Sequence, residues 1–437
     1  MIASLPPKLR PAVSPYTGII HNVEECLCAA CEPSIFRAAC ELGAGEGLLG
    51  SDLDHLSGVG GMGRSRSAAA SAAVGEALER YSATYVPVAR LVAASAAELG
   101  EAAVRPERFA LFSEGQHRIR GFPFQRFEER TRVYWVEGRE IRTGRCAYLP
   151  AELVFLGRAR PDDAVPIGYA TSSGLACHEE VDTAVERALL ELLKRDAFML
   201  VWANRLSLPL LDGRGCPSIE RDEAVFSAAG LRYAAVDLSV FHRLPTVLGV
   251  VRAPEGFAGS VGVGAAAAPT IELAWWKALA EAFATRAAGA KLALIADGAE
   301  SPDLGRKLRS FEDHIRHYAS HANARATSFL DASESRIPAA AIPPVEGASR
   351  SERLSALCQR VEAAGATAYA VDVTSPDVAE LGLAVTRVLA PELCSLDVAH
   401  EARFLGGPRL YEAAARAGLR ATPLGQQDVN PDPHPFP

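Results

Sequence analysis

The sequence lacks three features that would assign the protein to a particular class. No apolar run is long enough to span a bilayer, and prolines in the first segment, MIASLPPKLRPAVSP, leave no apolar core for a signal peptide. Positive charge is not in excess, because the chain has 45 Lys and Arg residues and 53 Asp and Glu residues. The resulting net charge of −8 argues against non-specific nucleic-acid binding. We therefore expect a cytoplasmic protein with no membrane or nucleic-acid partner, whose nine cysteines are mostly reduced thiols.

Candidate metal ligands are present, but none completes a standard metal motif. Four cysteines follow the spacing C-x-C-x2-C-x8-C: Cys26, Cys28, Cys31 and Cys40. Because no second CxxC or histidine pair follows, buried thiols are favoured over a zinc site, which stays the alternative. The segment FEDHIRHYASH places His314, His317 and His321 on one helix face. Without a nearby acidic pattern, a solvated face is favoured there over a metal site.

A glycine-rich stretch, GVGGMGRSRS, occupies residues 58–67. It does not match the phosphate-loop pattern GxxxxGK[ST], because Met62 and Arg64 stand where the lysine is sought. We expect a loop here, and backbone amides at the start of the following helix are a candidate anion site.

Two predicted helices carry carboxylates. One covers about 182–204, where Val185, Leu189 and Leu192 recur at helical spacing and predict a buried face. The other begins near Ser71 and carries Glu76 and Glu79, which lie three residues apart and therefore leave the same face. Two such helices can meet across a site for metal and phosphate. Two amphipathic helices with solvated glutamates are the alternative, and the pattern alone favours it.

The second half of the chain contains two similar segments, here called the internal repeat: AAGLRYAAVDLS (228–239) and AAGATAYAVDVT (363–374). Each segment follows a predicted helix and contains an apolar strand that ends with Val-Asp. Each is followed by a second strand, from Thr246 and from Ala384. This predicts two related α/β units, with coincidence as the alternative.

The last residues, NPDPHPFP, alternate proline with other residues. Proline fixes φ, so the segment is expected to be extended and to lose little entropy when it is ordered. It can therefore hold the terminal Pro437 at a definite place; a frayed end is the alternative.

Taken together, these segments resemble the YcaO family. SAAVGEALERYSA, TSSGLACHEEVDTAVERALLELLKRDAFMLVWANRL and EAFATR are similar to its three signatures, and PHPFP is similar to the ending of its azoline-forming members. The likeness runs from about Ser14 to Pro437. It implies a mixed α+β, YcaO-like fold, with an N-terminal segment at 1–55, the YcaO-like domain at 56–429 and the tail at 430–437.

The resemblance also implies a chemistry. A Cys, Ser or Thr side chain of a ribosomally made precursor peptide attacks the preceding carbonyl, and ATP phosphorylates the amide oxygen so that phosphate leaves and an azoline ring forms. Mg2+ neutralises the triphosphate. Related members make thioamides or amidines by the same activation. The implied partners are the precursor peptide and a leader-binding protein similar to a ubiquitin-activating enzyme, and a homodimer is expected.

The resemblance assigns roles to individual residues. Glu76, Glu79 and Glu191 are implied as Mg2+ and nucleotide ligands, and Arg286 as a phosphate contact. The cofactor-binding set is completed by residues near those positions, namely Ser71, Glu186 and Lys194. Three prolines of the tail are implied to lie at the reaction centre: Pro433, Pro435 and Pro437.

The sequence departs from the family pattern at four positions of this site. Met62 replaces a lysine, Ala72 a serine, and Thr183 and Lys194 two glutamates; Ser71 and Glu186 are candidates to compensate. An ammonium one turn from Glu191 would compete with Mg2+. We therefore predict weak or no binding of Mg-ATP. An ATP-incompetent paralogue, which binds peptide or scaffolds a second YcaO protein, is the alternative to a catalytic azoline-forming subunit, and a thioamide- or amidine-forming relative is a further alternative. For Lys194, the competing view is a direct phosphate ligand.

Overall fold

The computed structural model describes residues 1–43, 59–161, 164–227, 230–295 and 308–437. It has the mixed α+β composition that the sequence predicts. The chain divides into two compact units built from separate segments. Unit 1 contains residues 1–27, 35–192 and 347–392, and unit 2 contains 28–34, 193–346 and 393–437. The predicted division at 55/56 lies outside the described residues, and the predicted domain limits stay a prediction.

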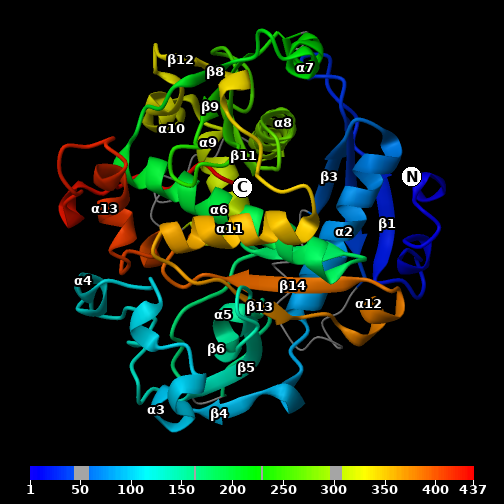
Figure 1. Ribbon diagram of the computed structural model, residues 1–437. Helices are drawn as coiled ribbons and strands as arrows, with labels where there is room; N and C mark the ends of the chain where they lie inside the picture. Colours follow the sequence, from blue (N-terminus) through cyan, green and yellow to red (C-terminus); the bar gives the residue numbers. More distant parts are fainter. Residues whose placement is uncertain (44–58, 162–163, 228–229, 296–307) are drawn as a thin grey trace. The chain divides into compact units, whose positions relative to one another are not determined.

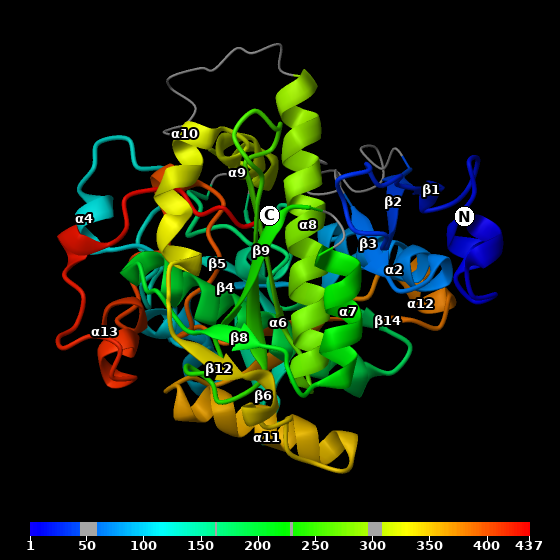
Figure 2. The same ribbon diagram turned by 90° about the horizontal axis from the view of Figure 1, so that it is seen from above.

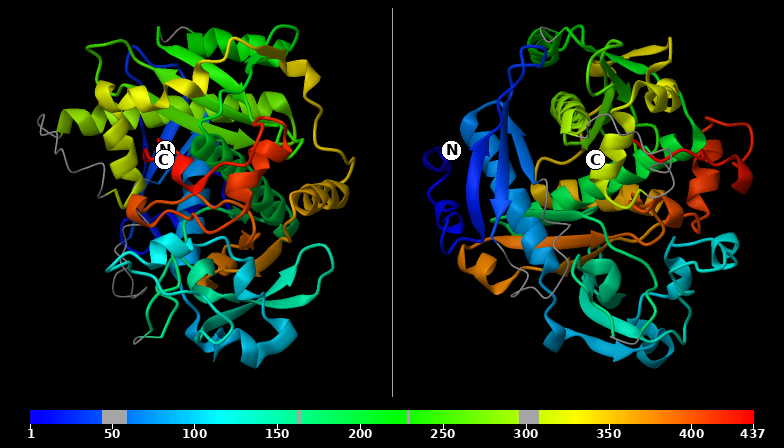
Figure 3. Two further views of the ribbon diagram at one scale, coloured as in Figure 1. Left: turned by 90° about the vertical axis from the view of Figure 1, so that its left-hand side faces the viewer. Right: turned by 180° about the vertical axis from the view of Figure 1, so that it is seen from behind.

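The first sheet of unit 1 is antiparallel, in the order β1-β2-β3. Its strands are β1 (Ile20–Glu25), β2 (Phe36–Leu42) and β3 (Gly60–Gly63). Helix α2 (Arg66–Thr84) packs on this sheet, as Figures 1 and 3 show. It begins five residues before Ser71 because the Ser65 side chain caps it by accepting from the amide of Ala68.

The prediction of a loop at the glycine-rich stretch is wrong for its described part, and Gly58 lies outside the described residues. Gly60–Gly63 form strand β3, which pairs with β2. A Cβ on Gly61 would lie 2.2 Å from the backbone nitrogen of Ala73, and one on Gly63 would lie 2.5 Å from that of Ala69. These glycines therefore let the strand approach α2 closely.

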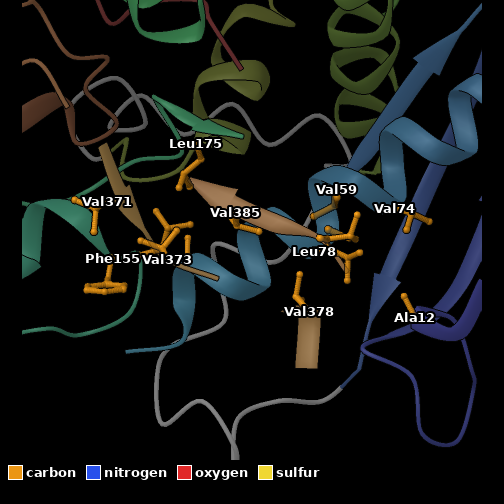
Figure 4. Close-up of a cluster of buried hydrophobic side chains, with 14 of the residues drawn as sticks. Ala12, Val59, Val74, Leu78, Phe155, Leu175, Val371, Val373, Val378 and Val385 are labelled. Carbon is orange, nitrogen blue, oxygen red and sulfur yellow. The ribbon is translucent and has the colours of Figure 1, made fainter. Parts of the chain in front are cut away.

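The second sheet of unit 1 has the order β4-β5-β13-β14-β7, and β6 also pairs with β5. The strands are β4 (Val92–Ala94), β5 (Val133–Glu140), β6 (Cys146–Pro150), β7 (Leu175–His178), β13 (Tyr369–Asp372) and β14 (Ala384–Leu389). The further helices of this unit are α3 (Ala96–Leu99), α4 (Glu114–His117), α5 (Ala151–Val154), α11 (Arg350–Ala363) and α12 (Pro376–Glu380). Figure 4 shows the core between sheet and helices, where Leu78 of α2 lies beside Val385 of β14 and Val378 of α12.

Unit 2 is built on a sheet in the order β11-β10-β9-β8-β12. Its strands are β8 (Leu210–Asp212), β9 (Arg232–Asp237), β10 (Thr246–Arg252), β11 (Val261–Ala267) and β12 (Arg336–Pro338). Its helices are α7 (Pro217–Ser227), α8 (Ile271–Ile295), α9 (Phe311–Tyr318), α10 (His321–Ala324) and α13 (Arg409–Arg416). Figure 2 shows α8 extended beside the sheet. Gly262 and Gly264 of β11 permit this contact, because a Cβ on either would lie 2.3–2.4 Å from backbone atoms of Ala282.

Helix α6 (Val181–Asn204) begins one residue before the predicted start and supplies residues to both units. Its last turns are apolar, and Phe198 and Trp202 are fully buried in the core of unit 2. The predicted helix over about 182–204 is therefore confirmed.

The two segments of the internal repeat have the same local structure. β9 pairs with β10, and β13 pairs with β14, each in antiparallel register. The side chain of Asp237 accepts from the Ser239 amide, and the Ser239 hydroxyl accepts from the amide of the next strand. Asp372 and Thr374 repeat both bonds. A duplication stays a prediction, and Ala228 lies outside the described residues.

Within the described ranges, no helix is long and apolar enough to cross a membrane.

Candidate functional site

Unit 1 brings together carboxylates from α2 and α6. Glu76 and Glu79 leave one face of α2, and both Glu76 and Glu191 act electrostatically on Glu79. Desolvation, together with these two negative charges, raises the pKa of Glu79 to about 8. The structure therefore places the three glutamates predicted as ligands within electrostatic range, and it favours a protonated Glu79 at neutral pH.

Two arginines partly offset this negative charge. Arg80 donates to Glu76 at 2.6 Å. Arg387 is buried, donates to the carbonyl oxygens of Thr171 and Leu153, and also lies within electrostatic range of Glu79. Desolvation lowers the pKa of Arg387 to about 10. In the part of the chain that the structure describes, no three His, Cys, Asp or Glu side chains are arranged to hold a metal ion.

Of the residues proposed to compensate for the departures from the family pattern, Glu186 is engaged elsewhere. Glu186 is buried and bound to Arg353 at 2.8 Å. Thr183 donates to Glu180 at 3.0 Å. Ser71 is half-buried on α2. Glu186 is therefore held in an ion pair within unit 1.

In unit 2, Lys194 and Arg195 of α6 both lie over the ring of Phe436. Their cationic groups are 5.4 Å and 4.3 Å from its centroid, a geometry that permits cation–π attraction. Arg195 also donates to the carbonyl oxygen of Pro437 at 3.4 Å. Lys194, which occupies a position that the resemblance assigns to a glutamate, is buried against the C-terminal segment.

The predicted phosphate contact, Arg286, is buried in unit 2 with its donors directed at protein groups. It donates to the carbonyl oxygens of Gly259 and Ala258 at 3.1 and 2.7 Å, and lies 3.5 Å from the carboxylate of Glu32. A phosphate would have to compete with these partners. The role of Arg286 in phosphate binding stays a prediction.

The C-terminal tail, residues 430–437, lies inside unit 2 and is not frayed. The residues from Pro433 to Phe436 are buried, whereas Pro437 is partly exposed. Tyr318 donates to the carbonyl oxygen of Pro433, and Trp202 donates to that of Asp432 at 3.1 Å. The alternating prolines favour the extended course that presents these carbonyls to donors.

A buried polar centre that the sequence analysis did not identify surrounds Asp196 on α6. Its carboxylate accepts from His242 at 2.8 Å, from Arg409 at 2.7 Å and from the amide of Cys394. Burial alone would raise the pKa of Asp196, but the guanidinium of Arg409 and the bond from His242 hold it well below its usual range. The sequence feature that could have indicated this centre is the charged Asp196 at the start of the otherwise apolar stretch 196–203.

The predicted solvated histidine face is wrong. His314 is fully buried on α9, whereas His321 belongs to the separate helix α10 and bonds to Ser260. Among the cysteines, burial and the charges of Glu76 and Cys26 raise the pKa of Cys40 to about 12, which disfavours the thiolate that zinc needs.

The family model described as YcaO cyclodehydratase, ATP- and Mg2+-binding, matches residues 60–394. None of the curated proteins compared with the chain matches it in sequence. A heterocyclase in complex with substrate and cofactor superposes with a TM-score of 0.79 at 23% identity, over 98% of this chain and 56% of that one. The chain thus spans little more than half the length of that heterocyclase.

Two further structures share the fold. YcaO from Methanopyrus kandleri, bound with AMPPCP and Mg2+, has a TM-score of 0.57 at 20% identity, covering 87% of each chain. A chain of the E. coli microcin synthetase McbBCD complex with pro-MccB17 bound has a TM-score of 0.63 at 12% identity, covering 95% of this chain and 96% of that one.

Proposed function

Because the chain belongs to the YcaO cyclodehydratase family, we propose that it is a subunit that forms azoline rings from Cys, Ser or Thr of a ribosomally made peptide. The observation that carries this proposal is the family match over residues 60–394, which includes α2, most of the strands and all of α6. We expect the reaction in the cytoplasm.

The carboxylates of unit 1 are the residues that would hold a divalent cation, although within the described residues they do not form a ready-made set of metal ligands. Burial, followed by the negative charges of Glu76 and Glu191, raises the pKa of Glu79, and a hard cation with a preference for oxygen ligands would take the place of its proton. When bound, ATP would supply the phosphoryl group that turns an amide oxygen into a good leaving group. The chain's own part would be to hold the cation at these glutamates and to position the reacting amide.

The tail supports an additional role in positioning. Pro433, Pro435 and Pro437 fix its course, and Arg195 holds the last carbonyl. We propose that the end of the tail lies at the reaction centre, as the resemblance implies, where a fixed backbone excludes water and orients the peptide.

A second candidate function is an ATP-incompetent paralogue that binds peptide or scaffolds an active partner. Two observations favour it. Arg286 is occupied by Glu32 and backbone carbonyls, and Lys194 lies on Phe436. Both cations therefore contact groups of the protein itself, and Met62, Ala72 and Thr183 remove further polar groups that the resemblance assigns to the site.

One reconstitution distinguishes the two functions. The purified chain is mixed with the precursor peptide, the leader-binding partner and Mg-ATP, and mass spectrometry measures the loss of one water per ring. A catalytic subunit gives water loss that requires ATP and that Glu79→Gln reduces. If water loss appears only after a second YcaO protein with intact glutamates is added, and still requires this chain, the scaffolding function is correct. If this chain makes no difference in either mixture, both functions are wrong.

The proposed partners follow from the same premise. We propose that the chain binds a precursor peptide through a separate leader-binding protein and forms a homodimer. Co-purification and light scattering test these two statements. Tight binding of leader peptide by the chain alone would contradict the first, and a monomeric mass would contradict the second.

A further inference from the structure

The histidine at the centre of α9 has an unusual set of partners. His314 is fully buried, its Nδ1 lies 2.7 Å from the carbonyl oxygen of His434, and its Nε2 lies 2.9 Å from the carbonyl oxygen of Val398. Both ring nitrogens therefore face acceptors. We propose that His314 is a positioning residue which, as an imidazolium with two N–H donors, holds the C-terminal tail in place.

The argument rests on the number of hydrogens that an imidazole carries. A neutral ring has one N–H donor and one lone pair, so at His314 the lone pair would point at a carbonyl oxygen at hydrogen-bond distance. An imidazolium has two donors and satisfies both carbonyls. Leaving a buried carbonyl unpaired is costly, and a bond from a charged donor is stronger than one from a neutral donor.

His434 on the tail shows the opposite pattern. Its Nδ1 accepts from the amide of Phe436 at 3.2 Å, and its Nε2 donates to the carbonyl oxygen of Asp397. One acceptor and one donor define the neutral ring. The two imidazoles stack at 4.2 Å with an interplanar angle of 19°, so the pair consists of one cation on one neutral ring and avoids two adjacent cations.

Charged groups around the pair are compatible with a cation at His314. Asp397 is a buried carboxylate close to the pair: it lies 3.8 Å from Arg403 and 3.7 Å from Nε2 of His434, and it interacts electrostatically with His314. The other titratable and charged groups nearby are His317, His400, Arg195 and Asp432. Desolvation and then neighbouring positive charge lower the pKa values of His317, His400 and His434. Burial and neighbouring positive charge therefore disfavour the charged form of these three rings.

The contact to His434 fixes a specific part of the tail. Asn430 is anchored independently, because its amide donates to Ala203 and its side chain to Trp202. Beyond Pro433, the bonds of the tail run through the His434 carbonyl, its ring and Arg195. Loss of the imidazolium is therefore expected to loosen residues 434–437 locally, without expelling Phe436 from the core, while leaving the preceding segment bound. A consequence for ring formation rests on the proposed function of the tail.

Two measurements on the full chain test the protonation state and its effect. Nitrogen NMR of a 15N-histidine sample at neutral pH should show an imidazolium pattern that disappears in His314→Asn. Hydrogen exchange at the Phe436 amide should be about tenfold faster in that variant, because one charge-assisted bond is lost. His321→Asn, in the same unit but away from the tail, is the matched control and should leave both signals unchanged. A neutral pattern for His314, or unchanged exchange at Phe436, would overturn the proposal.

If His314→Asn loosens the tail but ring formation is unchanged, the positioning role of His314 stands and the proposed role of the tail at the reaction centre is wrong.

Discussion

Replacing Glu79 by Gln should remove a pH dependence of stability that the carboxylate cluster of unit 1 creates. The pKa of Glu79 is raised from 4.5 to about 8 by desolvation and by its neighbours Glu76 and Glu191. The unfolded chain is ionised at this position above pH 4.5, whereas the folded chain retains the proton until about pH 8. The folded state binds more protons in this window, so stability falls as the pH rises through it and is constant above it.

The size of the effect follows from linkage. One pKa unit corresponds to about 1.4 kcal/mol, so the wild type should lose roughly 2 kcal/mol between pH 6 and pH 8, as an upper limit because solvent screens the exposed part of the side chain. Glu79→Gln keeps the shape and the neutral charge and should lack this loss. Urea unfolding of both proteins at several pH values measures the difference. Parallel stability curves for the two proteins across this range would refute the reasoning.

Further predictions concern the tail, the Asp196 centre, the nucleotide and the glycine strand. Because Phe436 is fully buried on Phe198, deleting Phe436 and Pro437 should cost about 3–5 kcal/mol of unfolding free energy, measured by calorimetry, and an unchanged thermal midpoint would show that the ring is not part of the core. Asp196→Ala should cost about 3–5 kcal/mol in urea unfolding because it leaves Arg409 buried without its partner, and a loss no larger than that of a surface Asp→Ala would contradict the ion pair. Titration calorimetry should detect weak or no Mg-ATP binding by the chain alone; micromolar binding that Lys194→Ala abolishes would make Lys194 a phosphate ligand. Gly262→Ala should cost about 1–3 kcal/mol because its Cβ would lie 2.3 Å from the Ala282 carbonyl oxygen, whereas Gly75→Ala, which meets nothing within 4 Å, should be neutral or stabilising; equal effects would exclude close packing as the cause.

The sequence predicts helices and strands better than it predicts which residues, far apart in the chain, contact one another. The apolar spacing of Val185, Leu189 and Leu192 predicts α6 within one residue, because a helix depends on neighbours three and four positions away. The start of α2 is missed because the glycines that precede Ser65 suggest a loop, although the serine is a helix cap and the glycines belong to a strand. The close approach of α2 that requires those glycines is a contact between elements, which spacing alone does not show.

The candidate site shows the same limit. Glu76 and Glu79 are predicted to share a face from their spacing, and their position on α2 agrees with this. The pairing of Arg286 with Glu32 joins positions far apart in the chain, and so does the contact of His314 with His434. No periodicity encodes such pairs. The burial of Phe436 depends on a contact of the same kind, since its ring packs on Phe198 of α6, far away in the sequence.

The glycines of β11 have a consequence for how the length of this region can vary during evolution. Gly262 lies against Ala282 and Arg286, and Gly264 against Ala278 and Ala282. Two strand residues thus correspond to four helix residues, because about 6.6 Å of strand matches about 6.0 Å of helix. A single-residue insertion would move side chains into the contact. In aligned relatives, a tolerated change in the length of β11 should therefore add or remove two residues, and it should be accompanied by a change of four residues in α8.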